Sequence, residues 1–246
     1  MFSGHKCENM PEGTGACDHL EEQLPGMRFW GETFVGARMP VRGIGPLDET
    51  PDATDSVMWL IYAAQNSTTV SITWAPGLIG IPFESRLFNR GESVLFEVTG
   101  SADNPGDIFI SADKPIAVFH FMTGSGGPNT EELGDPSMVY ITPTEQYLSR
   151  YVVVMPENWI NDFLVITRKG GKPVLLDEVF IPNEYFSDVA GNDFQVAHIP
   201  ISDGIHTIES VDPESGINVY AVGYDVADSY AYPGGMGVKV INIVVE

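Results

Sequence analysis

Two stretches of the chain share one pattern, and this pattern limits the possible folds more than any other feature of the sequence. Residues 106–124 (GDIFISADKPIAVFHFMTG) contain an alternating segment, a polar corner at Ser111–Pro115 and an apolar segment. Residues 204–225 (GIHTIESVDPESGINVYAVGYD) repeat this order around a corner at Asp212–Gly216. Period-two alternation indicates a half-buried strand, and a short apolar run is typical of a buried one. We therefore predict one hairpin in each stretch and two copies of one domain.

Other segments of the two halves follow each other in the same order. The corresponding pairs are residues 31–40 with 147–156, residues 57–74 with 163–176, and residues 92–98 with 193–201. The loop after Met-Pro is longer in the first half, and insertions of this kind belong in loops. Short strands separated by turns rich in Gly and Pro are typical of β-sandwiches. The sequence thus predicts an all-β fold of two tandem β-sandwich domains related by an internal repeat.

Changes in composition give the domain boundaries. We predict a short cysteine-bracketed N-terminal segment at 1–26, a first sandwich at 27–127, a Gly-rich acidic linker at 128–137 and a second sandwich at 138–246. In the N-terminal segment, we expect Asp18–Gln23 to form a helical turn capped by Asp18. Residues 236–245 alternate and predict a final strand.

The charge of the chain narrows the classes of partner. The 246 residues carry a formal net charge of -22, although 43% of them are hydrophobic and can form a core. Such a chain has no means of neutralising many phosphates, which argues against nucleic acid and against anionic membrane surfaces. No apolar run reaches the length of a membrane span, so we predict no membrane insertion. The acidity favours cations, a basic partner or simply a solvated surface.

The N-terminus indicates a piece of a longer protein. The first residues, MFSGHKCENMPEG, lack the apolar region of a signal peptide, so we interpret the chain as a mature or excised fragment. Phe2-Ser3-Gly4 resembles the ends of the two return strands. We therefore expect the chain to begin on the last strand of an earlier repeat.

Cys7 and Cys17 are the only cysteines, and their spacing leaves three interpretations open. They form a disulfide that closes a short loop, remain as two thiols, or provide half of a metal site. A zinc site needs two more ligands and usually a tighter cysteine spacing. His5 and His19 flank the pair, so ligation by two cysteines and two histidines has to be considered.

The residues provide little support for catalysis. The sequence contains neither a Gly-x-Ser-x-Gly motif nor a His-Glu-x-x-His motif. His120 lies in an apolar segment and is expected to be a core histidine. His206 lies near Asp203 and is expected to make a surface hydrogen bond. We therefore predict that the protein is not an enzyme.

Two acidic loops are candidate calcium sites, because hard cations bind several carboxylate and carbonyl oxygens. The candidate ligands are Asp48, Asp52, Asp55, Glu131, Glu132 and Asp135. The alternative is that both loops are simply solvated. No other cofactor is indicated.

Four aromatic residues are candidates for ligand contact. Trp59 and Trp74 lie in predicted strands and are expected in the core. Tyr230 and Tyr232 precede Pro233-Gly234-Gly235, where a loop could present one of them to a ligand. Packing between the two sandwiches is the alternative role for these tyrosines.

Three motifs together resemble the N-terminal domain family of IgGFc-binding proteins. They are Gly4-His5-Lys6-Cys7 with Cys17–Gln23, Asp135–Met138 with Pro143–Gln146, and Ile199–His206 running to Ser229–Gly235. The resemblance covers most of the chain. It implies an extracellular, β-rich binding or adhesion module with a Cys7–Cys17 disulfide. Antibody binding is not carried over, because that name comes from a few animal members.

The resulting expectation is a non-catalytic binding or adhesion module of a larger secreted or cell-surface protein. Its expected partners are a protein or glycan ligand and neighbouring repeats of the same protein. Two alternatives remain, a structural repeat spacer and a calcium-dependent carbohydrate-binding module. Binding to a glycan or protein array would distinguish a ligand-binding module from a structural spacer. Loss of binding in the presence of a chelator would identify a calcium-dependent carbohydrate-binding module.

Overall fold

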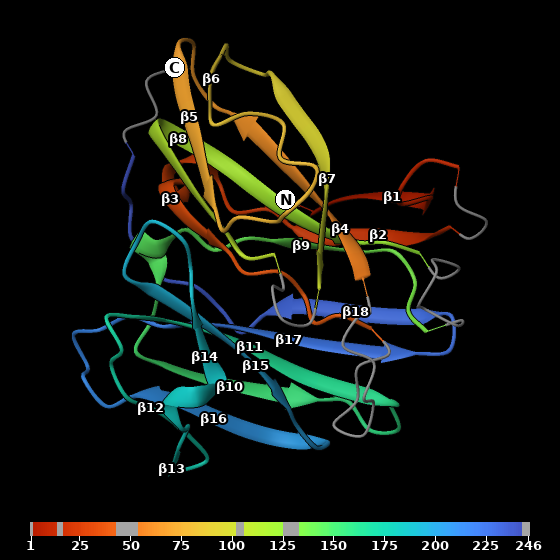
Figure 1. Cartoon of the computed structure of the whole chain (residues 1–246), viewed down its shortest axis with the longest axis vertical. Coiled ribbons are helices and arrows are strands. Elements are labelled where there is room, and N and C mark those ends of the chain that lie inside the picture. Colours follow the sequence, from red (N-terminus) through yellow and green to blue (C-terminus); the bar gives the residue numbers. More distant parts are fainter. Residues whose placement is uncertain (1, 14–16, 43–53, 102–105, 125–132, 243–246) are drawn as a thin grey trace.

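The computed structural model is an all-β protein (Figure 1) and describes residues 2–13, 17–42, 54–101, 106–124 and 133–242. The helical elements within these ranges are short 3-10 turns: η1 (Met27–Phe29), η2 (Thr144–Gln146) and η3 (Asn183–Tyr185). None of the described helices is long and apolar enough to cross a membrane.

The first half of the chain forms one sheet around a 15-residue strand, β8. Its strands are β3 (Gly31–Gly36), β4 (Thr54–Ala63), β5 (Thr68–Trp74), β6 (Ser85–Phe88), β7 (Ser93–Ser101), β8 (Ile108–Met122) and β9 (Ser137–Tyr140). The N-terminal part of β8 pairs with β3 and β5. Its C-terminal part pairs with β4 and β9. The long strand therefore connects two groups of neighbours, which β6 and β7 extend.

The hairpin predicted at residues 106–124 is wrong, because β8 runs through the polar corner without turning back. The polar residues there form hydrogen bonds with backbone atoms of the adjacent connection between β4 and β5. Asp113 Oδ1 accepts a hydrogen bond from Thr69 N at 2.8 Å, and Lys114 Nζ donates to Asn66 O at 2.7 Å. The corner thus marks the place where β8 changes neighbours.

The second half forms two sheets. The order β10-β16-β12-β13 gives a four-stranded sheet, and the order β14-β15-β11-β17-β18 gives a five-stranded sheet. The strands are β10 (Arg150–Met155), β11 (Asn161–Lys169), β12 (Val174–Leu176), β13 (Val179–Phe180), β14 (Phe186–Asp188), β15 (Phe194–Pro200), β16 (Gly204–Ser210), β17 (Asn218–Asp225) and β18 (Asp228–Pro233).

The second predicted hairpin is also wrong, because its two strands lie in different sheets. Strand β16 pairs with β10 and β12, whereas β17 pairs with β11 and β18. The corner at Asp212–Gly216 carries the chain from one sheet to the other. A polar turn between two apolar strands has the same sequence pattern whether the two strands pair with each other or lie in different sheets.

The five-stranded sheet is buried on both faces. Alternate side chains of β11 illustrate this: Leu164 and Ile166 pack against the four-stranded sheet, whereas Phe163 and Val165 belong to the core cluster that contains the first half. That cluster also includes Trp59, which is fully buried as predicted, and Trp74 packs at its edge. One apolar core therefore contains residues of both halves.

The N-terminal segment is a hairpin of β1 (Phe2–Glu8) and β2 (Asp18–Gln23). The helical turn predicted for Asp18–Gln23 is wrong, because these residues pair with β1. Leu20 is 3% exposed and belongs to a cluster with Phe119 and Phe121 on the outer side of β8. Tertiary packing of this kind outweighs the weak local preference of a short polar segment.

The strand predicted for residues 236–245 is absent from the part that the structure describes, which ends at Asn242. Instead, Gly237 N donates to Gln146 O at 2.7 Å and Ile241 N donates to Arg28 O at 3.0 Å. The alternating residues thus lie along other loops, and Val238 and Val240 remain exposed.

The segment after β3 is buried between the two halves, although it forms no strand. From Ala37 to Arg42 every residue is buried. The carbonyl oxygen of Arg38 lies 2.9 Å from Nε2 of His198, and that of Pro40 accepts a hydrogen bond from Tyr224 Oη at 2.8 Å. Buried backbone groups need such partners, and side chains of the second half provide them here.

Arg42 ends this segment in a buried ion pair with Asp55. Arg42 Nη2 and Nε donate to the two Asp55 carboxylate oxygens at 2.7 and 2.9 Å, and Nη1 donates to Thr123 O at 2.7 Å. Burial alone would raise the pKa of Asp55, but the hydrogen bonds and charge of Arg42 lower it below its ordinary value. The stabilisation is therefore present above the ordinary pKa of an aspartate and is lost as the pH falls.

We predict that Arg42→Met destabilises the protein by about 3–5 kcal/mol, because it leaves the Asp55 carboxylate buried without its partner. Urea unfolding followed by tryptophan fluorescence measures this loss. The exposed Arg150→Met is the matched control and should change the free energy of unfolding by less than about 0.5 kcal/mol. Equal effects of the two substitutions would contradict the role given to the ion pair.

Candidate functional site

The outer face of the four-stranded sheet exposes an unusual share of apolar side chains. Strand β10 alternates strictly, with Tyr151, Val153 and Met155 buried and the residues between them exposed. Those exposed residues include Val152 and Val154, which are 58% and 57% exposed. Apolar residues therefore occupy both the buried face and the solvent-exposed face of this strand.

Neighbouring strands continue the apolar surface. Ile205 on β16 lies opposite Val154 and is 71% exposed, and Phe180 on β13 lies opposite Leu175 and is 61% exposed. Single exposed apolar residues are normal on proteins, but contiguous ones mark interaction sites. We call the set Val152, Val154 and Ile205, which are neighbours in the sheet, the apolar face. Phe180 is separated from this set by Leu175 and Glu209.

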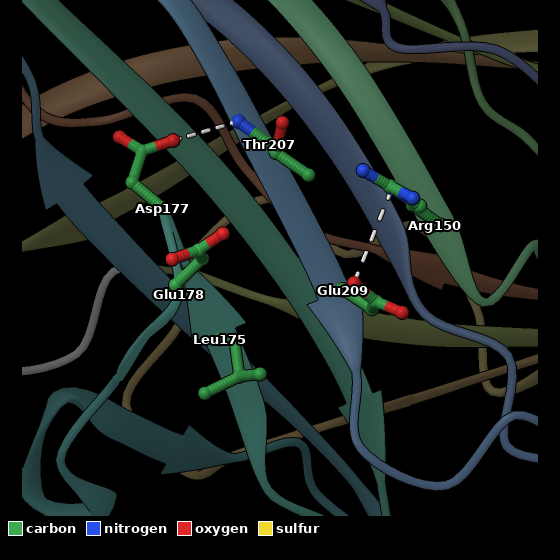
Figure 2. Close-up of a pocket in the computed structure, with 6 residues that line it drawn as sticks. All are labelled: Arg150, Leu175, Asp177, Glu178, Thr207 and Glu209. Atoms are coloured by element: carbon green, nitrogen blue, oxygen red, sulfur yellow. Dashed lines mark hydrogen bonds and ion pairs between the residues drawn. The ribbon is translucent and has the colours of Figure 1, made fainter.

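A shallow cleft of about 270 Å³ opens on the same sheet, as Figure 2 shows. It is lined by Arg150, Leu175, Asp177, Glu178, Thr207 and Glu209. Arg150 and Glu209 approach to 4.0 Å, and both side chains are largely exposed. The lining therefore contains three carboxylates and one guanidinium, which makes the cleft acidic.

The turn between β12 and β13 places two of these carboxylates. Asp177 and Glu178 both have positive φ angles, 49° and 67°, as a tight two-residue hairpin turn requires. Asp177 Oδ1 accepts a hydrogen bond from Thr207 N at 2.8 Å, and Oδ2 lies 2.7 Å from Nδ1 of His206. Burial alone would raise the pKa of Asp177, but these hydrogen bonds lower it below its ordinary value. The hydrogen bonds from Thr207 and His206 therefore favour the charged form of this carboxylate.

The surface hydrogen bond predicted for His206 is wrong, because the residue is buried at 7% exposure and its ring has other partners. Its Nδ1 lies near Asp177 rather than Asp203, and its Nε2 lies 2.8 Å from Ser202 O. His120 is fully buried in the core, as expected. Burial lowers the pKa of His120 to about 3, which keeps the ring neutral.

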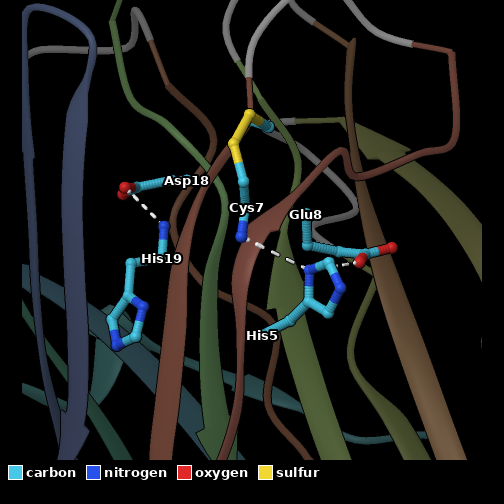
Figure 3. Close-up of a disulfide and its surroundings, with 6 residues drawn as sticks. His5, Cys7, Glu8, Asp18 and His19 are labelled. Atoms are coloured by element: carbon cyan, nitrogen blue, oxygen red, sulfur yellow. Dashed lines mark hydrogen bonds and ion pairs between the residues drawn. A yellow bond between two sulfur atoms is a disulfide. The ribbon is translucent and has the colours of Figure 1, made fainter.

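The two cysteines form a disulfide across the N-terminal hairpin, drawn in Figure 3. Their Cα atoms are 5.1 Å apart. The flanking histidines have separate partners: His5 Nδ1 lies 2.9 Å from Glu8 Oε2, and His19 Nε2 lies 3.2 Å from Glu21 Oε2. The disulfide interpretation is confirmed, and it removes both thiolates that a metal site would need.

Four of the six candidate calcium ligands, Asp48, Asp52, Glu131 and Glu132, lie outside the described residues. Asp55 is bound by Arg42, as shown above. Asp135 is buried beside Ser229, whose Oγ accepts a hydrogen bond from Asp135 N at 2.8 Å. The described ranges contain no group of three or more His, Cys, Asp or Glu residues placed to hold a metal ion. Calcium binding by the two loops stays a prediction.

The two candidate tyrosines pack at the end of the second core. Tyr230 reaches over Gly223 and donates to Asp162 Oδ1 at 2.5 Å, and Tyr232 donates to Val154 O at 2.5 Å. Their rings stack with centroids 6.0 Å apart, and Trp159 meets Tyr230 edge-on. A ligand-binding role for these tyrosines stays a prediction, and their hydroxyl groups already have partners.

Sequence reasoning missed the apolar face and the acidic cleft. A signal was present in RYVVVM, where apolar residues occupy both phases of the strand, although this pattern also fits a strand buried on both faces. The grouping of Asp177 and Glu178 with Glu209 depends on the pairing of β12 with β16, which no local pattern reveals.

We predict that Asp135→Asn stabilises the protein more at pH 8 than at pH 4. Burial, followed by the Asp18 and Asp228 carboxylates, raises the pKa of Asp135 to about 6. The folded state then binds more protons than the unfolded state between pH about 4 and 6, so stability falls as the pH rises through this window. Urea midpoints of the variant and the wild type at both pH values measure the difference. The exposed Glu157→Gln is the control, and a pH-independent effect of Asp135→Asn would contradict the prediction.

Comparison with known proteins gives one family and no close relative of known structure. No curated protein matches the chain. One solved structure, an "anti-sigma factor domain-containing protein", aligns over 82% of this chain and 81% of its own at 10% identity, with a TM-score of 0.20. That similarity is too weak to support a shared fold. The family model described as "IgGFc binding protein" matches residues 1–223. Because this match covers nearly the whole chain, the protein belongs to the IgGFc-binding protein family.

Proposed function

We propose that this chain is a non-catalytic, extracellular binding module of a larger secreted or cell-surface protein. The observation that carries the proposal is the exposed apolar face beside the acidic cleft on the four-stranded sheet. The family to which the chain belongs supports binding rather than catalysis. The disulfide supports an oxidising location, where such bonds persist.

The proposed occupant of this surface is a protein segment that carries a Lys or Arg side chain next to apolar side chains. The cationic group would enter the cleft, where Asp177, Glu178 and Glu209 outnumber Arg150. The apolar side chains would cover Val152 and Ile205. The chain's net charge of -22 would speed the approach of a basic partner.

We further propose that the two halves are copies of one sandwich domain, with the boundaries predicted from the sequence, except that the end of the first copy moves from residue 127 to β9 (Ser137–Tyr140). The order of strand pairing supports this. In the first half, the N-terminal part of β8 pairs with β3 and β5, and in the second half β16 pairs with β10 and β12. The C-terminal part of β8 pairs with β4 and β9, as β17 pairs with β11 and β18. By this correspondence, the first copy extends through β9.

We predict that a random-peptide display library panned on the wild-type protein yields sequences with Lys or Arg next to apolar residues. Val152→Asp and Ile205→Asp should each reduce their binding at least about tenfold, because a charge interrupts the apolar contact. Both positions are exposed, so thermal stability should stay within about 2 °C of the wild type. Biolayer interferometry measures the binding.

The matched control is Leu87→Asp, a substitution of an exposed apolar residue on β6 in the other half. It should leave peptide binding unchanged. Glu178→Gln combined with Glu209→Gln should weaken the preference for basic peptides. Acidic peptide sequences, or equal losses in Leu87→Asp and Ile205→Asp, would rule out this surface as the binding site.

A further inference from the structure

Arg38 is a fully buried arginine whose guanidinium makes no hydrogen bond within the described part of the chain. The residue is 1% exposed, and Nε, Nη1 and Nη2 all lack an acceptor. A buried charged group without partners costs several kcal/mol, and a guanidinium does not lose its proton to avoid this cost. The position therefore calls for an acceptor other than the described residues of the chain.

The nearby carboxylates do not meet this need. The Asp55 carboxylate is taken by Arg42, which forms two hydrogen bonds with it. Asp107 Oδ1 accepts from the backbone N of Arg38 at 2.9 Å, not from its side chain. Burial raises the pKa of Asp107, and the carboxylates of Asp55 and Asp107 attract the Arg38 guanidinium without forming a hydrogen bond with it. The Tyr224 hydroxyl donates to Pro40 O, and the imidazole of His198 contacts the carbonyl of Arg38.

Two unpartnered donors of the first half lie close to the backbone of the residue that follows Arg38. Trp59 and His120 lie opposite each other on β4 and β8, with ring centroids 4.6 Å apart. His120 Nε2 accepts a hydrogen bond from Met39 N, the residue after Arg38, at 3.4 Å. A neutral ring that accepts at Nε2 carries its proton on Nδ1. Nδ1 of His120 and Nε1 of Trp59 are both buried without partners.

We propose that Arg38 binds a small inorganic anion, a halide in the simplest case, at the buried junction between the two halves, with Trp59 and His120 as neighbouring donors. An anion fits better than water for two reasons. It accepts hydrogen bonds from several donors at once, and it adds negative charge beside a guanidinium to which neither nearby carboxylate, Asp55 or Asp107, is hydrogen-bonded. This inference is independent of the binding function proposed above.

The test compares thermal unfolding in sodium bromide or chloride with unfolding in sodium gluconate at equal ionic strength, because gluconate is too large for a buried site. Equal ionic strength removes the general screening effect expected for so acidic a chain. Halide at about 100 times its Kd should raise Tm by about 5–10 °C in a saturable manner. Arg38→Met should abolish this shift, and Arg150→Met should retain it. Identical Tm values in halide and gluconate for the wild type, or a halide shift retained by Arg38→Met, would overturn the proposal.

Two measurements keep the test decisive if Arg38→Met does not fold. Trp59→Phe removes the Nε1 donor and keeps most of the ring, so it should weaken the halide dependence and raise the halide concentration at half-effect. A bromide-soaked crystal of the wild type should show anomalous scattering beside the Arg38 guanidinium. Anomalous peaks found only elsewhere, or an unchanged halide dependence in Trp59→Phe, would count against the site.

Discussion

The buried ion pair between Arg42 and Asp55 anchors the segment that lies buried between the two halves. Through Arg42 it joins the buried segment after β3 to the start of β4 and, at Thr123, to the end of β8. The same guanidinium approaches Leu133 O at 3.4 Å, and Leu133 bridges to Val226 in the second half. A bidentate, desolvated pair holds its partners in one geometry, which exposed pairs do not.

Around this pair, the two halves share one apolar core. The five-stranded sheet contributes one face to this core and its other face to the core of the second half. The hydroxyl group of Tyr220 takes part as well, because it accepts a hydrogen bond from Thr142 N at 2.8 Å in the connection between the halves. The four-stranded sheet lies on the far side of this arrangement, so its outer face is free of the rest of the described chain and available to a partner (Figure 1).

Local patterns in the sequence predicted strands well, but they did not predict which strands pair. Val70, Ile72 and Trp74 alternate, and they lie on β5 as expected. The polar corners at Ser111–Pro115 and Asp212–Gly216 were interpreted as hairpin turns, although they mark changes of neighbour, because pairing depends on contacts far apart in the chain. Asp55 was predicted to be a calcium ligand in a loop. Its partner Arg42 could not be predicted, because nothing near Asp55 in the sequence identifies this contact. The acidic cleft likewise depends on long-range pairing.

Because the two halves share one core, and the Arg42–Asp55 pair anchors the segment between them, we expect both halves to unfold as one cooperative unit. Native-state hydrogen exchange at increasing urea concentrations tests it most directly, with the amides of β4 reporting on the first half and those of β11 on the second. We expect the most protected amides of both strands to converge on one free energy of unfolding with one urea dependence. Two separate free energies, with one half opening while the other stays protected, would contradict it.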